Sequence, residues 1–343
     1  MSANRVSPGA LAGGPWFEDL EVGQVELGAP GLTLTDGHAA AHQAITGDRL
    51  ALALDAHLSR DVVGDGDARL AHPALVWDVA IGQSTLLTQR VIANLFYRGL
   101  AFRRLPAIGD TLRTRTEVVG LRQTSRRDGR AARGLAALRI TTVDQQSRGV
   151  LDFWRCAMLP LRDPTAETGR DDDLERLAGS AATGPLDAAV AGWRLGALRE
   201  AIDAPGFEAL VSGASWAVEG GDVVSAAPEL ARLTLNVAVA HHDRARAGGD
   251  GRRLVYGGHT IAIAAAQAAR TLPTLATIVA WHDCTHLAPV FEGDTLRSRL
   301  ELEGREPLSS GGGLAHLRSR VRAIGEDGDE RDVLDWRFVA VLA

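Results

Sequence analysis

Two short stretches, LPAIGDTL at residues 105–112 and APVFEGDTL at residues 288–296, decide the fold of this 343-residue chain. In each stretch a proline stands a few residues before the sequence Gly-Asp-Thr-Leu. The glycines of the two copies, Gly109 and Gly293, lie 184 residues apart. A Gly-Asp turn suits glycine, which adopts positive φ angles at little cost. After each turn polar and apolar residues alternate, which predicts a strand. The chain therefore contains an internal duplication.

The same offset aligns two apolar segments, residues 73–88 and 257–270, and pairs Gly82-Gln83 with Ala266-Gln267. Both are rich in alanine, leucine and isoleucine, which predicts two buried helices. We expect strands at 91–102, 112–121, 136–143 and 150–159, and again at 276–284, 296–303, 313–323 and 333–342. One central helix followed by an antiparallel sheet, twice, is an α+β plan. The two sheets can join edge to edge and so cover their exposed edges.

The length allows two domains of ordinary size. We place an N-terminal domain at 1–161, a linker at 162–185 and a C-terminal domain at 186–343. The linker is rich in Asp, Gly, Ala and Thr and contains three consecutive aspartates at 171–173. Residues 1–15 are small and polar and lack the features of a signal peptide, so we expect a disordered lead-in and a cytoplasmic protein.

Charge and composition exclude several classes of protein. Lys and Arg total 37 against 43 acidic residues, for a net charge of -6, which argues against nucleic acid as the main partner. No apolar run approaches the roughly 18 residues of a membrane span, so no membrane partner is expected. Two distant cysteines, Cys156 and Cys284, do not suggest a disulfide framework or a cysteine-rich metal site.

Histidine is the side chain best able to move protons near neutral pH. The second half contains His241, and Asn236 precedes it by five positions. On a continuous helix that spacing separates the two side chains by roughly 140° around the axis. They can act together only if the helix ends or bends near residues 238–240.

The duplicated plan resembles the double hotdog fold of the MaoC-like (R)-specific enoyl-CoA hydratase family. Residues 16–24, WFEDLEVGQ, resemble the family's opening segment. The family's catalytic motif is an aspartate followed five residues later by a histidine, and Asn236 and His241 keep that spacing with asparagine for aspartate. Residues 255–259, VYGGH, occupy the place of the His-Gly turn that opens the family's central helix. The similarity is greatest to mesaconyl-CoA hydratases (β-methylmalyl-CoA dehydratases), through residues 251–259 and 291–295.

The first half departs from this motif, because the position five residues after Asp48 is Ala53. No histidine is available there for proton transfer. We therefore expect Asp48 to be a turn or cap residue. The first half would be structural and would supply a wall of the substrate tunnel.

The resemblance implies hydration of a 2-enoyl-CoA, with CoA as part of the substrate and no separate cofactor or metal. His241 would be the general base and Asn236 would orient the water. The amides of Gly257 and Gly258 would receive the thioester oxygen. Further substrate contacts are expected at Tyr256, His259, Arg252 and Arg253, although surface charge explains the two arginines equally well.

Several points stay open. An acyl-CoA thioesterase would place a carboxylate on a central helix, and Asp78 lies in the first one. A non-catalytic acyl-CoA-binding protein would explain the asparagine at position 236. His282 and His286 can lie on one face of a strand, but no third metal ligand is apparent. We expect a homodimer or a higher homo-oligomer.

Overall fold

The computed structural model describes residues 13–64, 69–126, 131–178, 185–243, 245 and 252–343. Most of the lead-in expected at 1–15 lies outside the described residues. So do part of the linker, residues 179–184, and Gly251 of the segment 251–259.

One antiparallel sheet of twelve strands runs through the molecule, in the order β1-β4-β5-β6-β3-β9-β12-β11-β10-β7, with β2 paired to β4 and β8 to β10. Its long strands, four from each half, are β3 (Ala93–Phe102), β4 (Thr111–Gln123), β5 (Arg133–Val143), β6 (Gly149–Pro160), β9 (Leu275–His286), β10 (Thr295–Pro307), β11 (Gly313–Ile324) and β12 (Glu330–Leu342). The short ones are β1 (Val25–Glu26), β2 (Leu32–Thr33), β7 (Ser215–Ala217) and β8 (Asp222–Val223). All eight strands expected from the repeat are confirmed.

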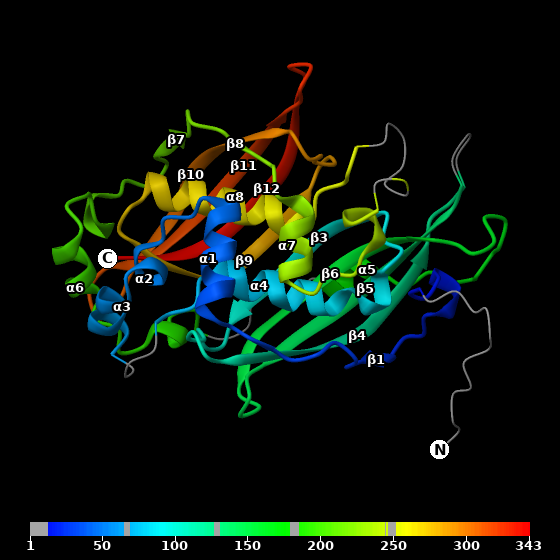
Figure 1. The fold of residues 1–343 in the computed structure, drawn as a ribbon, viewed down its shortest axis with the longest axis horizontal. Helices are drawn as coiled ribbons and strands as arrows, with labels where there is room; N and C mark the ends of the chain where they lie inside the picture. The colour runs from blue at the N-terminus through cyan, green and yellow to red at the C-terminus, as the bar shows by residue number, and fades with distance from the viewer. Residues whose placement is uncertain (1–12, 65–68, 127–130, 179–184, 244, 246–251) are drawn as a thin grey trace.

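The two halves join where β3 pairs with β9, as the edge-to-edge expectation required (Figure 1). Tyr97 pairs with Cys284 and Leu100 pairs with Trp281. Tyr97 and Trp281 are 184 residues apart, as are Leu100 and Cys284. Residues that lie 184 positions apart are therefore related by a pseudo-two-fold axis between the two central strands.

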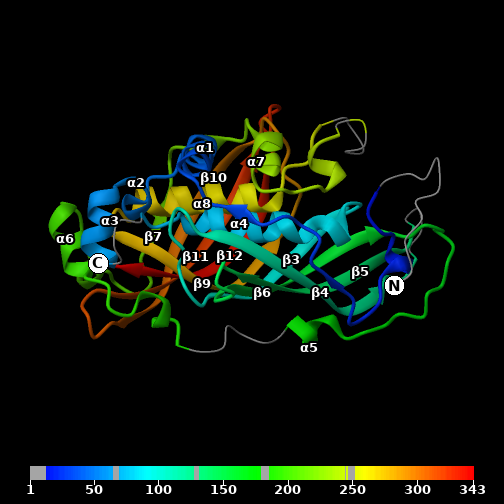
Figure 2. The ribbon, with the colours of Figure 1, turned by 60° about the horizontal axis from the view of Figure 1, so that its bottom comes forward.

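Two buried helices lie side by side over one face of this sheet (Figures 1 and 2). α4 (Pro73–Gln83) continues as the 3₁₀ helix η2 (Ser84–Thr88), and α8 spans Gly257–Thr271. Every residue of α4 is buried. Trp77 of α4 packs edge-on against Trp281 of β9 at 4.9 Å and Trp336 of β12 at 6.1 Å between ring centroids. A helix of the first half thus packs on strands of the second, and the halves share one hydrophobic core.

Shorter elements that the sequence did not predict surround this frame. They are α1 (Asp36–Thr46), α2 (Ala51–Leu54), α3 (Ala56–Val63), α5 (Leu174–Ala178), α6 (Leu195–Ala201) and α7 (Ala227–Leu233). α5 lies within the expected linker and packs against β4 and β5, and Asp171 forms a β-bridge with Arg122. This part of the linker is therefore docked on the first half. In the described part of the chain, no helix is long and apolar enough to cross a membrane.

Candidate active site

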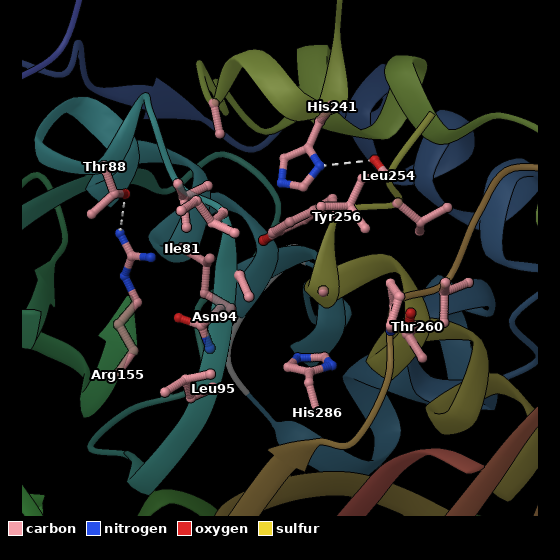
Figure 3. Close-up of a pocket in the computed structure, with 18 of the residues that line it drawn as sticks. Ile81, Thr88, Asn94, Leu95, Arg155, His241, Leu254, Tyr256, Thr260 and His286 are labelled. Atoms are coloured by element: carbon pink, nitrogen blue, oxygen red, sulfur yellow. Dashed lines mark hydrogen bonds between the residues drawn. The ribbon is translucent and has the colours of Figure 1, made fainter. Parts of the chain in front are cut away.

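A cavity of about 320 Å³ opens between the two halves and is lined by both residues that the sequence singled out, Asn236 and His241. Figure 3 shows His241 at this cavity. Its lining residues from the second half include Asn236, His241, Leu254, Tyr256, Gly257, Thr260 and His286. Those from the first half include Ile81, Thr85, Thr88, Asn94, Tyr97 and Arg155. The first half therefore supplies a wall of the site, as expected.

His241 ends a 3₁₀ turn, η5 (Val239–His241), and is buried. Its Nδ1 lies 3.0 Å from the carbonyl oxygen of Leu254. A carbonyl can only accept a hydrogen bond, so Nδ1 carries the ring proton and Nε2 keeps its lone pair. Burial lowers the pKa of His241 to about 4, against the opposing bond to Leu254, so the ring is neutral at physiological pH. A neutral imidazole with a free Nε2 is the form that a general base requires.

Asn236 reaches the same cavity because the chain breaks between it and α7. α7 ends at Leu233, and Leu235 adopts a left-handed conformation with φ 60°. The break therefore precedes Asn236, a few residues before the predicted position at 238–240. The Oδ1 of Asn236 accepts a hydrogen bond from the amide of Ala238 at 2.9 Å. This bond commits the oxygen and leaves the Nδ2 hydrogens to orient a ligand or a water.

The glycine turn begins α8, with Tyr256 as the N-cap residue. The amides of the first helical turn have no partner within the helix and carry the positive end of its dipole. Gly257 lines the cavity, and a Cβ there would lie 2.7 Å from Nε2 of His286. Gly258 does not line the cavity; a Cβ there would lie 2.2 Å from a carboxylate oxygen of Asp78. The structure thus brings Gly257 to the site and gives Gly258 a packing role.

Of the other residues expected to contact the substrate, one lines the cavity and three do not. Tyr256 lines the cavity and donates a hydrogen bond from its hydroxyl to the carbonyl of Asp78 at 3.1 Å. His259 is not a lining residue: it is fully buried, and burial lowers its pKa to about 3. Arg253 forms an ion pair with Glu292, and Arg252 stacks on Phe291. Neither arginine lines the cavity, so their role toward CoA stays a prediction.

His282 and His286 lie on different faces of β9, so the shared face that alternation allows is not formed. The register of β9 against β12 shifts between Trp281 and Asp283, and this bulge at His282 interrupts the alternation of side chains. His282 stacks on His316, whereas His286 lines the cavity. Burial lowers the pKa of His286 to about 4.

The sequence did not predict the polar residues that the first half contributes to the cavity wall. Thr85, Thr88, Asn94 and Arg155 carry no motif, and their strand and helix patterns read as ordinary core. The signal was nevertheless present in the repeat. The residues 184 positions after Thr85, Thr88 and Asn94 are Ala269, Leu272 and Ile278, so polar groups in one copy stand where apolar groups stand in the other.

The corresponding place in the first half holds a buried network. Asp48 accepts a hydrogen bond from the amide of Leu50 at 2.8 Å and lies 2.8 Å from Nε2 of His72. The bond from Leu50 fits the expected turn, but the buried His72 beside Asp48 contradicts the expectation that no histidine would be available there. Asp78 lies 3.1 Å from Nε2 of His42, and burial raises the pKa of this carboxyl. Asp78 does not line the cavity, so the geometry gives a thioesterase based on it no support.

Comparison with known proteins agrees with this geometry. The chain is 29% identical over 318 residues to the β-methylmalyl-CoA dehydratase of Chloroflexus aurantiacus, covering 90% of this chain and 88% of that protein. It is 30% identical over 323 residues to the mesaconyl-CoA hydratase of Cereibacter sphaeroides, covering 89% and 88%. No protein-family model matches.

Solved structures extend the comparison to the fold. A conserved hypothetical protein from Mycobacterium tuberculosis with a double hotdog fold is 54% identical, with a TM-score of 0.89 over 96% of this chain and 99% of that one. A putative MaoC domain dehydratase from C. aurantiacus is 26% identical, with a TM-score of 0.83 over 96% and 97%.

The fold and the cavity between its halves define the class: this is a MaoC-like double hotdog protein. Within that class, the chain belongs to the family of mesaconyl-CoA hydratase and β-methylmalyl-CoA dehydratase. It is therefore an acyl-CoA hydratase/dehydratase, a hydro-lyase, and the resemblance seen in the sequence is confirmed.

Proposed function

We propose that this protein adds water reversibly across the double bond of a short 2-enoyl-CoA, with mesaconyl-CoA to β-methylmalyl-CoA as the specific reaction. The observation that carries the chemistry is the free Nε2 of a neutral, buried His241 facing a cavity beside Asn236. The names of the two curated relatives support the substrate.

The proposed reaction uses one proton carrier. The Nδ2 of Asn236 donates a hydrogen bond to a water, and Nε2 of His241 removes a proton from that water as its oxygen attacks C3. Enolate charge builds on the thioester oxygen, which the amide of Gly257 receives at the helix N-terminus. His241 then returns the proton to the α-carbon on the same face. Removing a donor of the Gly257 kind typically costs roughly 3 kcal/mol of barrier.

Substrate-level assays test this proposal. Wild-type protein should remove the enoyl-thioester absorbance of mesaconyl-CoA without releasing free thiol. Activity on crotonyl-CoA alone would reject the carboxylate-bearing substrate and keep the hydratase. Thiol release that is lost in Asp78→Ala and kept in His241→Ala would indicate a thioesterase, and binding without hydration across an acyl panel would indicate a binding protein.

Two further expectations belong to this proposal. We infer that the protein works in the cytoplasm on acyl-CoA thioesters, without a separate cofactor. We also infer that it assembles as a homodimer or a larger homo-oligomer of double hotdog units.

A further inference from the structure

The cavity contains a buried positive charge that the hydration steps do not use. Arg155 of β6 lines the cavity and is 3% exposed. Within the described part of the chain no carboxylate pairs with it, and burial lowers the pKa of its guanidinium. Arginine is rarely buried without a counter-ion, because an unpaired charge loses its hydration without compensation. The missing partner points to an anionic ligand.

The hydrogen bonds of Arg155 explain its position and leave part of its donor set unused. Nη2 donates to the carbonyl of Ser84 at 3.0 Å. It also donates to the hydroxyl of Thr88 at 2.8 Å (Figure 3). Both acceptors lie at the end of the α4–η2 helix, so these bonds hold the guanidinium still. Nε is buried without a partner, and Nη1 donates no hydrogen bond to a described residue. A purely structural role accounts for only one of the three nitrogens.

The duplication shows that the fold does not need an arginine here. Arg155 pairs with Tyr97, whereas Phe338 pairs with Trp281, the counterpart of Tyr97 in the second half. An aromatic side chain therefore fills the equivalent place, and it is fully buried.

The neighbours of Arg155 differ from their counterparts in the same way. Thr88 and Asn94 line the cavity, and the second half has Leu272 and Ile278 in their places. The Oδ1 of Asn94 is also buried without a partner. Positions 88 and 94 are thus polar in the copy whose wall faces the cavity, and apolar residues stand at the equivalent positions of the other copy.

We propose that Arg155 is the specificity-determining residue of this enzyme, binding the carboxylate of a 2-enoyl-CoA whose short acyl chain ends in a carboxylate. A guanidinium matches a carboxylate in charge and in planar hydrogen-bond geometry. Thr88 and Ser84 orient Arg155, and the two guanidinium nitrogens that they leave unused are the donors available to the carboxylate. This inference rests on the proposed hydration at His241, because it names which acyl chain is held there.

Steady-state kinetics of Arg155→Met on two substrates test the proposal. Methionine keeps the aliphatic part of the side chain and removes the charged guanidinium, so kcat/KM for mesaconyl-CoA should fall roughly 100-fold. The value for crotonyl-CoA, which has no carboxylate, should stay the same or rise. Arg155→Lys should lie in between. Arg139→Met is the matched control, because Arg139 is paired with Asp152 outside the cavity, and it should behave as wild type on both substrates.

A binding measurement on wild-type protein covers the case in which Arg155→Met does not fold. Succinyl-CoA, which has a carboxylate and no double bond, should bind at least 10-fold more tightly than butyryl-CoA by calorimetry. Equal loss of both substrates in the folded variant, or equal binding of the two saturated thioesters, would overturn the role of Arg155. Failure of hydration itself would differ, because wild type would then act on neither enoyl-CoA.

Discussion

The environment of His241 fixes its protonation state. Burial disfavours the imidazolium, and the carbonyl of Leu254 holds the proton on Nδ1. The ring is therefore a base over the whole neutral range, and no carboxylate of the described residues pairs with it. Asn236 fits this arrangement because an amide orients a water without adding negative charge. The motif spacing predicted the pair, but its burial and tautomer depend on residues 13 positions away, which no local pattern reveals.

The pH dependence of the free enzyme follows from this state. Protonation of Nε2 abolishes the base, so kcat/KM should be flat through neutral pH and fall as the pH drops through about 4. The profile should be recorded with crotonyl-CoA and mesaconyl-CoA. An acidic limb near the ordinary histidine pKa of about 6.5 would contradict the buried neutral ring.

Asn236→Asp should shift the acidic limb of the pH profile, where kcat/KM falls. A carboxylate at this position would stabilise the imidazolium of His241, raise its pKa and shift the acidic limb to higher pH by about one unit. Activity should persist, because Oδ1 still accepts from Ala238. Asn236→Ala is the matched variant without a charge, and its limb should stay in place while kcat falls. An unmoved limb in Asn236→Asp would show that the two side chains do not interact.

At the scale of elements, the loop that carries Asn236 lies directly on α4. A Cβ on Gly82 would lie 1.8 Å from the carbonyl oxygen of Thr234 and 3.2 Å from the nitrogen of Asn236. The equivalent residue of α8 is Ala266, which the repeat pairs with Gly82. The glycine is thus required where the loop that carries Asn236 crosses the first helix, whereas the equivalent position of the second helix accommodates an alanine.

Gly82→Ala should therefore lower both stability and activity. The clash is with backbone, which cannot move aside without shifting Asn236, so we expect a loss of about 2–4 kcal/mol in unfolding free energy. Urea unfolding and hydration kinetics would measure it. Ala266→Gly, the mirror change, should cost about 1 kcal/mol from helix propensity alone and leave kcat unchanged. Equal losses of unfolding free energy and of kcat in the two variants would show that the loop does not require a glycine at position 82.

The repeat predicted the regular elements because their patterns are long. Eight strands and two helices follow from alternation and from an apolar run, both of which extend over ten or more residues. The helices α2, α3, α6 and α7 have at most eight residues, and α1, although as long as α4, is half-exposed. Tertiary contacts rather than periodicity specify these helices. The bulge at His282 was missed for a related reason: it changes which face each side chain occupies without changing the sequence pattern.

On the scale of the whole molecule, the two halves share a core and one cavity. The sequence located the proposed catalytic residues Asn236 and His241 in the second half, but the opposite wall of the cavity comes from the first. Arg155 and Asn94 lie in strands that look like core, and only the closure of the sheet through β3 and β9 brings them opposite His241. Their roles could not follow from local patterns; comparing the two copies would have revealed their polarity.

Acid should destabilise the whole fold through its buried histidines. Burial lowers the pKa of His241 and His286 to about 4 and that of His259 to about 3. Unfolded histidines titrate near 6.5, so below that pH the unfolded chain binds more protons and stability falls. Three such groups give a slope of at most roughly 4 kcal/mol per pH unit. The raised pKa of Asp78 offsets part of it.

Urea midpoints between pH 7 and pH 4.5 would measure this slope. His259→Leu should make it shallower, because one buried titratable group is removed. A midpoint that does not change with pH over this range would show that the three rings are not neutral and buried together.

The most direct test of the account is hydration of mesaconyl-CoA by His241→Gln beside His282→Gln, with thermal unfolding of both proteins as a check. Loss of the general base should lower kcat/KM roughly 1,000-fold in His241→Gln without a change in unfolding temperature. His282→Gln, which changes a histidine on the outer face of β9, should match wild type. Hydration that survives in His241→Gln would contradict the central claim that this one neutral histidine carries the proton.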